Sequence, residues 1–150
     1  MPRRPWRPSS MKMLIELDFL IALIRSGDRH HREVVGILEE KRGELALSPY
    51  SLLELDLLLW SNRLKVRERG RFLILLDETL KYYLVEVLRP SPRHLSEAYK
   101  LRGSGLTFFD SLHAATALSE HIPLLSYDRS YEKVGELRYI HPSTLIDSPI

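Results

Sequence analysis

Four acidic side chains occupy positions from which a fold could gather them around an ion. Asp18 ends the first apolar run of the chain and Asp128 follows a late one, while Glu54 lies in a leucine-dense segment and Asp110 opens an amphipathic one. Carboxylates that come within roughly 4–6 Å of one another repel by about 3–4 kcal/mol per pair, so a fold that gathers them needs a cation or raised pKa values. Because carboxylate oxygens suit Mg²⁺ or Mn²⁺, the four acids predict divalent-metal chemistry.

The surroundings of these acids in the sequence qualify that prediction. Asp110 lies in the first turn of a predicted helix, where the helix dipole alone would explain a negative charge. Glu54 is flanked by leucines, and a lone carboxylate buried among them would be costly without a partner. Asp56 lies about 200° around the same helix, so it cannot serve the same ion. Ser126 faces the same side as Asp128 if the chain stays extended, which predicts a hydroxyl beside that carboxylate.

Short apolar runs alternate with helical patterns along the chain. The expected strands span residues 13–18, 45–47, 82–88, 122–126 and 138–141. The expected helices span residues 19–25, 29–42, 49–63, 66–80, 91–102 and 107–120. Three of these helices have a start signal: a serine–proline pair at 48–49, another at 91–92, and a capping box that opens at Thr107. The alternation predicts an α/β fold around a mostly parallel sheet of four or five strands, with ligands at the carboxyl ends of the strands.

Composition limits the class of protein. At 150 residues the chain fits a single domain, which we expect to span residues 11–150, after a flexible basic tail at residues 1–10. The absence of cysteine excludes disulfides, thiolate zinc sites and thiol nucleophiles, and it fits a cytoplasmic location. No run approaches the roughly 20 apolar residues of a membrane helix, so we expect no membrane association. Removing Arg3, Arg4 and Arg7 from the net charge of +2 leaves −1 for residues 11–150, so any attraction for nucleic acid must be local.

Four segments carry a resemblance to a known family. They read LIELDFLIAL, SPYSLLEL, LTFFDSLHAATA and LLSYDRSY, and they contain the four acids in order. These segments resemble the successive acidic motifs of PIN domains, and they are most similar to those of the VapC-type toxins of toxin–antitoxin operons. The resemblance covers about residues 11–146.

The resemblance implies a structure, an activity and partners. It implies a three-layer α/β/α fold with one or two Mg²⁺ or Mn²⁺ ions, endonucleolytic cleavage of RNA, a homodimer, and inhibition by a small antitoxin. By position, Asp18, Glu54 and Asp110 match the core acids of the family, Asp128 matches the fourth acid, and Ser126 matches a hydroxyl position before it. The first three would hold the metal, while Asp128 and Ser126 would hold a second ion or orient the attacking water.

The chain departs from the family at the first acidic motif. Phe19 and Leu20 stand where the family often has a hydroxyl or amide side chain, which removes an expected hydrogen bond near the metal. This departure motivates an alternative function, a non-catalytic PIN-like module that binds RNA or a protein partner. Glu16, on the same face of the expected strand as Asp18, stands where an apolar residue is commoner. It is either a further metal ligand or, as we prefer, an ion-pair partner.

Other polar residues have two interpretations each. His113 follows Asp110 by three positions, so it is a metal ligand or, as we prefer, a surface histidine or one that supports a ligand. His30 and His31 are expected in an exposed turn. The leucine-dense helix with Trp60 is expected to be buried core rather than a dimer surface. Five basic residues crowd one segment and would hold RNA phosphates or an acidic antitoxin segment, or form a solvated helix start. They are Arg63, Lys65, Arg67, Arg69 and Arg71.

Overall fold

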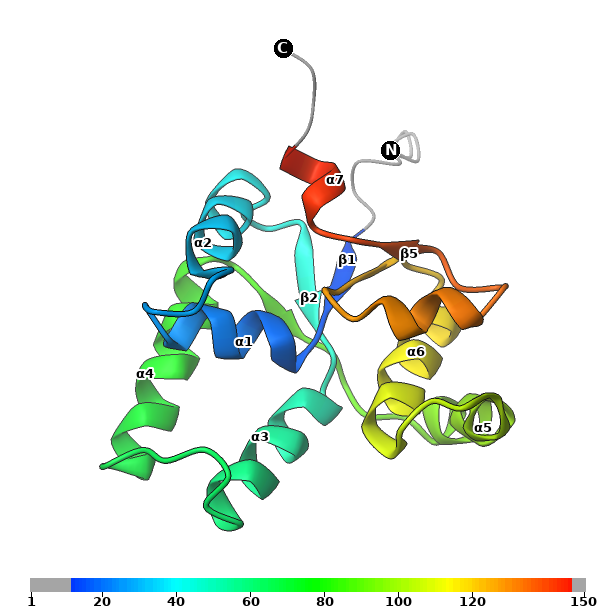
Figure 1. The fold of residues 1–150 in the computed structure, drawn as a ribbon, viewed down its shortest axis with the longest axis horizontal. Coiled ribbons are helices and arrows are strands. Elements are labelled where there is room, and N and C mark those ends of the chain that lie inside the picture. Colours follow the sequence, from blue (N-terminus) through cyan, green and yellow to red (C-terminus); the bar gives the residue numbers. More distant parts are fainter. Residues whose placement is uncertain (1–11, 147–150) are drawn as a thin grey trace, which may run out of the picture.

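A five-stranded parallel sheet forms the centre of the protein (Figure 1). The computed structural model describes residues 12–146, so the expected tail at residues 1–10 lies outside the described residues. The strands are β1 (Met13–Ile15), β2 (Leu45–Leu47), β3 (Glu86–Val87), β4 (Leu124–Leu125) and β5 (Tyr139–Ile140). They lie in the order β3-β2-β1-β4-β5, and every neighbouring pair is parallel. The predicted α/β class with a mostly parallel sheet is confirmed.

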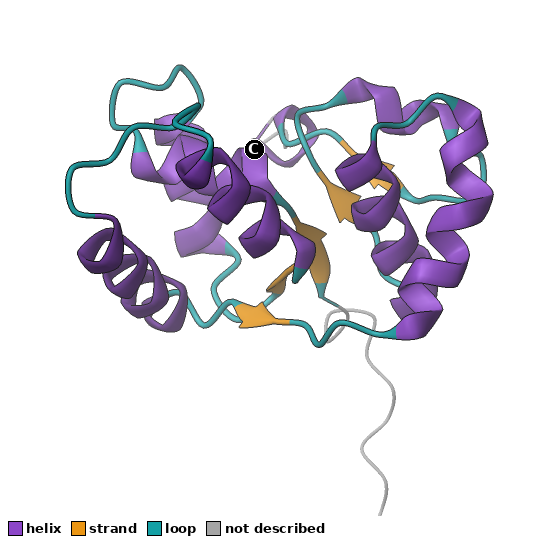
Figure 2. Cartoon of the chain, turned by 90° about the horizontal axis from the view of Figure 1, so that it is seen from below, coloured by secondary structure: helices purple, strands orange, loops and turns teal. Residues whose placement is uncertain are grey.

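Helices cover both faces of this sheet. The described residues form seven α-helices: α1 (Leu17–Ile24), α2 (His31–Glu40), α3 (Tyr50–Trp60), α4 (Arg69–Tyr82), α5 (Pro92–Leu101), α6 (Phe108–Glu120) and α7 (Ser143–Ile146). In Figures 1 and 2, α1, α2 and α4 lie on one side of the strands and α5 and α6 lie on the other. None of the helices within residues 12–146 is both long enough and apolar enough to cross a membrane.

Alternation along the strands divides the core into two halves. Leu14 and Leu124 pack with α5 and α6, whereas Ile15 and Leu125 pack with the helices of the opposite layer. Successive strand residues point to opposite faces, so a fully apolar strand must be covered on both sides. The three-layer α/β/α arrangement follows from this pattern.

The chain order places one crevice at the centre of the sheet. After β1 the chain adds β2 and β3 on one side, then returns to place β4 and β5 on the other side of β1. The direction of winding therefore reverses between β1 and β4, and ligands of such folds bind beyond the carboxyl ends of strands at this point. Glu16 directly follows β1 and Ser126 directly follows β4.

The first expected strand is too long in the sequence-based prediction. β1 ends at Ile15, and Glu16 is the N-cap of α1, with extended backbone angles and its side chain accepting a hydrogen bond from the Asp18 N–H at 3.2 Å. Asp18 is therefore the second residue of a helix and not the end of a strand. The capping carboxylate of Glu16 satisfies a helix N–H that has no partner within the helix, which lets the helix begin early.

Two other expected strands are also shorter than predicted. The aromatic pair Tyr82 and Tyr83 belongs to the end of α4, where the Arg42 guanidinium lies 4.6 Å from the Tyr82 ring centre. The edge strand β3 has only two residues, and it pairs with β2 alone. The strand expected at 122–126 is reduced to Leu124–Leu125. Aromatic residues at a helix end thus produced a false strand pattern at residues 82–85, while part of the expected strand, Glu86–Val87, is confirmed.

The expected burial of the leucine-dense helix is wrong. Leu55 and Leu59 of α3 are buried, but Leu53, Leu57 and Trp60 have 61%, 51% and 79% of their surface exposed. Only one face of α3 meets the core, so the leucines on the other faces remain in solvent.

Two of the three predicted helix starts are confirmed. Ser91 caps α5 by accepting from the Arg93 N–H, and Thr107 caps α6 by accepting from the Asp110 N–H. At the third start Pro49 itself is the N-cap of α3, without a side-chain hydrogen bond.

Candidate metal centre

An acidic pocket of about 370 Å³ lies beyond the carboxyl ends of β1 and β4. Its lining residues are Glu16, Leu17, Asp18, Ile21, Asp28, His30, Glu54, Asp110, Tyr127 and Asp128. The structure brings together all four acids singled out in the sequence, from α1, α3, α6 and the segment after β4. Ser126 is buried beneath them, and the described lining contains no lysine or arginine.

The carboxylate of Asp18 is held by three hydrogen bonds. Its Oδ2 accepts from the Ser126 hydroxyl at 2.9 Å and from the Tyr127 N–H at 2.7 Å, and its Oδ1 accepts from the Phe19 N–H at 2.8 Å. Burial raises the pKa of Asp18 well above its usual value, the nearby charge of Glu16 adds to the rise, and the three hydrogen bonds only partly oppose it. A bound cation would stabilise the charged form of this carboxylate.

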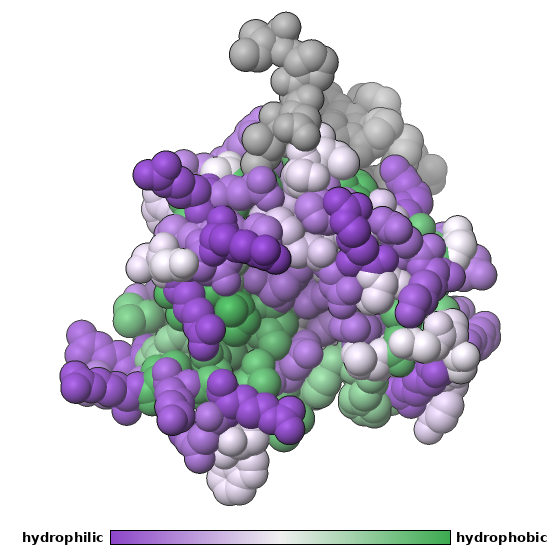
Figure 3. Space-filling view, viewed as in Figure 1, coloured by the Kyte–Doolittle hydropathy of each residue, from purple (hydrophilic) through white to green (hydrophobic). Residues whose placement is uncertain are grey.

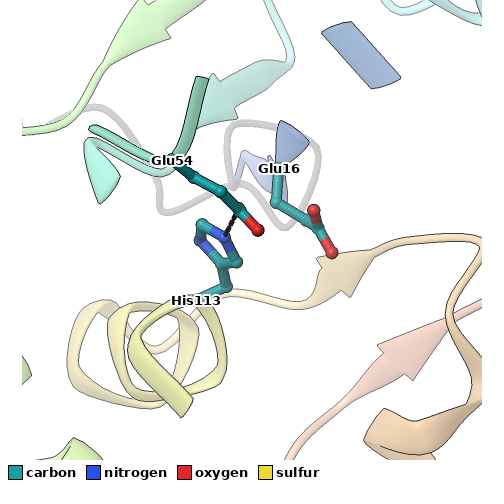
Figure 4. A group of neighbouring side chains, drawn as sticks. All are labelled: Glu16, Glu54 and His113. Atoms are coloured by element: carbon teal, nitrogen blue, oxygen red, sulfur yellow. Dashed lines mark hydrogen bonds and ion pairs between the residues drawn. The ribbon is translucent and has the colours of Figure 1, made fainter. Parts of the chain in front are cut away.

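His113 orients Glu54 from below. Figure 4 shows the imidazole pointing at the Glu54 carboxylate, with Nε2 at 2.9 Å from Oε1, while Nδ1 lies 2.7 Å from the Ser48 hydroxyl. Burial by itself would lower the pKa of His113, but the hydrogen bond to Glu54 and the charges of Glu16, Glu54 and Asp110 outweigh it and raise the pKa. The Nε2–H therefore donates to Glu54. His113 is buried, so its expected surface position is wrong, and its contact with Glu54 is that of a residue supporting a ligand.

Asp110 and Asp128 form the outer part of the pocket. Asp110 Oδ1 accepts from the Tyr131 hydroxyl at 3.1 Å. Burial raises the pKa of Asp110, and the charge of Asp128 contributes to the rise. Asp128 is exposed, and its Oδ1 accepts from the Ser130 N–H at 2.9 Å. Two carboxylates with unequal exposure are thus available at the mouth of the pocket.

Glu16 connects the aspartates through two hydroxyl groups. Its Oε2 accepts from the Ser126 hydroxyl at 3.1 Å and from the Tyr131 hydroxyl at 2.9 Å. The same two hydroxyls reach Asp18 and Asp110, respectively. The Ser126 hydroxyl thus contacts the carboxylates of Glu16 and Asp18. The sequence predicted that this hydroxyl would lie beside the Asp128 carboxylate, but Asp128 contacts it through its backbone N–H, at 3.1 Å.

The preferred interpretation of Glu16 as an ion-pair partner is wrong. Within residues 12–146, neither lysine nor arginine lies within ion-pair distance of its carboxylate, and Glu16 is 5% exposed. Burial raises the pKa of Glu16 although the charge of His113 opposes the rise. The sequence signal for a role of Glu16 in the pocket was its position, two residues before Asp18 and at the end of an apolar run.

Other lining residues gave little signal in the sequence. Asp28 and His30 lie in the turn between α1 and α2, and His30 is partly buried rather than in the exposed turn expected for it. Tyr127 and Tyr131 follow β4, and both hydroxyls donate to carboxylates. Their contacts come from residues far apart in sequence, which no local pattern specifies.

The residues of the pocket fit a hard divalent cation. The donors are carboxylate oxygens, and ligand atoms of Glu16, Glu54 and His113 all lie within 4.8 Å of one another (Figure 4). Since His113 donates its Nε2–H to Glu54, the oxygens remain as ligands. A Mg²⁺ or Mn²⁺ ion would neutralise such a group of acids, whose pKa values are raised and whose described lining contains no lysine or arginine.

The raised pKa values predict how stability depends on pH when metal is removed. A carboxyl whose folded pKa lies above its unfolded value near 4 binds more protons in the folded state between those two values, so the free energy of unfolding falls as pH rises through that window. The raised pKa of His113 acts in the same direction. With a chelator present, we expect thermal denaturation at about pH 5 to occur several degrees above that at about pH 8, at roughly 2–4 °C per kcal/mol.

Adding Mn²⁺ should oppose this trend, because metal binds the deprotonated carboxylates and so stabilises the protein more at higher pH. A melting temperature in chelator that rises steadily from about pH 5 to about pH 8 would contradict the assignment of these buried acids.

The fold and the pocket define a class of protein, a doubly wound α/β protein with an acidic site at its switch point. The sequence model of one family, the PIN domain, matches residues 13–137, and the chain belongs to the PIN domain family. A comparison with curated proteins finds no match.

Solved structures share this fold. VapBC2 from Rickettsia felis, bound to a DNA fragment from its promoter, superposes with a TM-score of 0.70 at 17% identity, covering 87% of this chain and 98% of that one. DNA-bound VapBC from Salmonella typhimurium gives 0.68 at 18% identity, covering 88% and 98%. PAE2754 from Pyrobaculum aerophilum gives 0.61 at 24% identity, covering 91% and 93%. At these identities the likeness concerns the fold.

Proposed function

We propose that this protein is a Mg²⁺- or Mn²⁺-dependent endoribonuclease, the toxin of a type II toxin–antitoxin pair acting in the cytoplasm. The observation that carries the proposal is the convergence of Asp18, Glu54, Asp110 and Asp128 on one pocket whose described lining has no lysine or arginine. The similarity of the fold to VapBC proteins supports the toxin assignment.

In this proposal, Asp18, Glu54 and Asp110 hold the metal. The chemistry that a divalent ion would supply there is polarisation of the scissile phosphate, a lowered pKa of bound water and compensation of charge on the leaving oxygen. Ser126 and the Tyr127 N–H fix the orientation of Asp18, and His113 fixes that of Glu54.

Asp128 is the most exposed of the acids that line the pocket, so in this proposal its carboxylate accepts a hydrogen bond from the attacking water. Ser126 is buried, so in this proposal it acts on water only through the carboxylates that it contacts.

The departure at Phe19 and Leu20 does not favour the non-catalytic alternative. Both side chains are 1% exposed and belong to the core, so they do not face the pocket. The hydrogen bonds that a polar residue there would have offered to Asp18 come instead from Ser126 and Tyr127. The site therefore keeps the support that a metal ligand needs.

The proposed function includes two protein partners: a second copy of this chain, in a homodimer, and a small antitoxin. Two apolar surfaces support them, because an exposed apolar patch of this kind usually marks an interface. One is the face of α3 with Leu53, Leu57 and Trp60. The other is a hollow of about 310 Å³ between α1 and α4, within the hydrophobic area visible in Figure 3 over α1, α3 and α4. The basic segment from Arg63 to Arg71 is exposed apart from Leu64 and Val66, and none of its residues lines the acidic pocket.

The test of the function is metal-dependent cleavage of RNA. Purified protein, free of antitoxin, is incubated with total cellular RNA in Mg²⁺, in Mn²⁺ or in excess chelator, and the new RNA ends are mapped by sequencing. We expect reproducible internal cuts with either metal, none in chelator, and recovery when metal is restored. Cuts that persist in chelator would contradict the metal mechanism, and RNA binding without cuts under every condition would favour the non-catalytic module.

A further inference from the structure

Two aromatic rings are stacked at the edge of the acidic pocket. The imidazole of His30 lies face to face with the Tyr127 ring, with centres 3.8 Å apart and planes 17° apart. Both residues line the pocket, and the Tyr127 N–H donates to Asp18 Oδ2 at 2.7 Å. We call His30 and Tyr127 the aromatic shelf. It is joined directly to Asp18, so a ligand bound on it would lie beside the acidic pocket.

The shelf is held in place from several sides. The Tyr127 hydroxyl donates to Glu33 Oε1 at 2.5 Å, and the ring meets the edge of His141 with centres 5.5 Å apart. The backbone N–H of His30 donates to Asp28 Oδ1 at 2.8 Å. A ring pair fixed before a ligand arrives loses little freedom on binding, which favours recognition of a flat ligand.

The Tyr127 ring has two stacked neighbours, His30 at 3.8 Å and Phe19 at 5.8 Å between ring centres, so the imidazole of His30 is the ring on which a ligand would stack. Arg29 Nε donates to His30 Nε2 at 3.2 Å, a further contact that fixes the position of this ring.

The charge of the pocket indicates which part of a nucleotide the shelf accepts. Six carboxyl groups line the pocket: Glu16, Asp18, Asp28, Glu54, Asp110 and Asp128. A phosphate placed away from the metal would be repelled by these groups, whereas an uncharged base would not. Stacking of a base on an aromatic side chain strengthens binding by roughly five- to a hundredfold.

We infer that the aromatic shelf binds the base of a nucleotide adjacent to the phosphate held at the acidic pocket. This inference rests on the proposed function for its substrate, RNA, but the shelf can be tested with ligands that are not cleaved. Stacking accepts every base, so the shelf positions the strand and need not select its sequence.

The test compares nucleoside 5′-monophosphates with ribose 5-phosphate, which lacks the base. Binding is measured by ligand-observed NMR in Mg²⁺ for the wild type, His30→Ala, His30→Phe and the matched control Tyr99→Ala. Tyr99 is an exposed aromatic residue of α5 outside the pocket lining. We expect the wild type to bind the nucleotides at least about fivefold more tightly than ribose 5-phosphate. His30→Ala should lose this preference, while His30→Phe and Tyr99→Ala keep it.

Equal affinity for ribose 5-phosphate and the nucleotides, an unchanged preference in His30→Ala, or no binding of any of these ligands would overturn the inference. Mg²⁺ titration and thermal denaturation of each variant show whether His30→Ala still holds metal and folds. If it does not fold, loss of the preference in His30→Phe, which keeps a ring, overturns the inference instead.

The experiments can reject base binding by the aromatic shelf and the proposed nuclease function independently of each other. Nucleotide preference without RNA cleavage would reject the nuclease and retain the shelf, whereas cleavage with unchanged preference in His30→Ala would do the reverse. If both hold, His30→Ala should raise KM for RNA more than it lowers kcat, as expected for a residue that positions substrate.

Discussion

Replacing Asp18 with asparagine is expected to lower the rate of RNA cleavage more than about a hundredfold, because loss of a residue that merely supports a metal ligand already costs roughly 10–100-fold. Asparagine keeps the shape of the side chain but removes a negative charge and one anionic oxygen. It also cannot accept from both the Tyr127 N–H and the Phe19 N–H, since only one amide atom is an acceptor. The measurement is the initial rate of cleavage at saturating Mn²⁺.

The same substitution should leave the protein folded. An unpaired N–H lowers the free energy of unfolding by about 1–3 kcal/mol. The substitution also removes a buried carboxyl whose pKa is raised by burial and by the charge of Glu16, and this removal stabilises the folded protein. These effects oppose each other, so we expect the melting temperature in chelator to change by only a few degrees.

Asp56→Asn is the matched control for Asp18→Asn. Asp56 lies on α3 two residues after Glu54, is exposed and does not line the pocket. Its variant should cleave at the wild-type rate. Full cleavage by Asp18→Asn, or an equal loss in Asp56→Asn, would remove the basis for placing the metal among these acids.

The sequence was sufficient to predict the sheet and the convergence of the acids for a physical reason. Fully apolar strands such as β2 and β4 must be covered on both faces, which requires parallel strands with helices between them. Parallel strands bring their carboxyl ends to one edge, so acids near the ends of β1 and β4 meet there whatever the details of the loops. Small errors at the strand ends therefore did not move Asp18 or Asp128 away from the pocket.

The surroundings of the acids could not be predicted in the same way. Whether Leu57 is buried depends on whether another element lies over that face of α3, which the composition of the helix does not state. The contact of His30 with Tyr127 joins residues nearly a hundred positions apart, and it depends on how a loop crosses the sheet. The role of Glu16 was missed because apolar residues on both sides of it hide the point at which β1 ends and α1 begins.

Glu16→Leu is expected to weaken Mn²⁺ binding roughly 10–100-fold, the usual loss when groups that orient metal ligands are removed. Leucine is the kind of apolar residue commoner at this position in the family that the sequence resembles. It removes the acceptor of the Ser126 and Tyr131 hydroxyls, which contact Asp18 and Asp110. The affinity is measured by isothermal titration of the metal-free protein, with Glu40→Gln, an exposed acid of α2, as control.

Glu16→Gln separates orientation of the ligands from simple charge. Glutamine removes the charge as leucine does, but its amide oxygen still accepts from a hydroxyl. If Glu16 acts by fixing Ser126 and Tyr131, Glu16→Gln should retain most of the affinity that Glu16→Leu loses, and Tyr131→Phe should reproduce part of the loss. Equal losses in Glu16→Gln and Glu16→Leu, with none in Tyr131→Phe, would mean that Glu16 attracts or binds the ion itself. In either case the buried carboxyl raises the free energy of the metal-free protein at neutral pH. Glu16→Gln keeps an oxygen that can accept the hydrogen bonds of Glu16, so this variant should melt above the wild type in chelator.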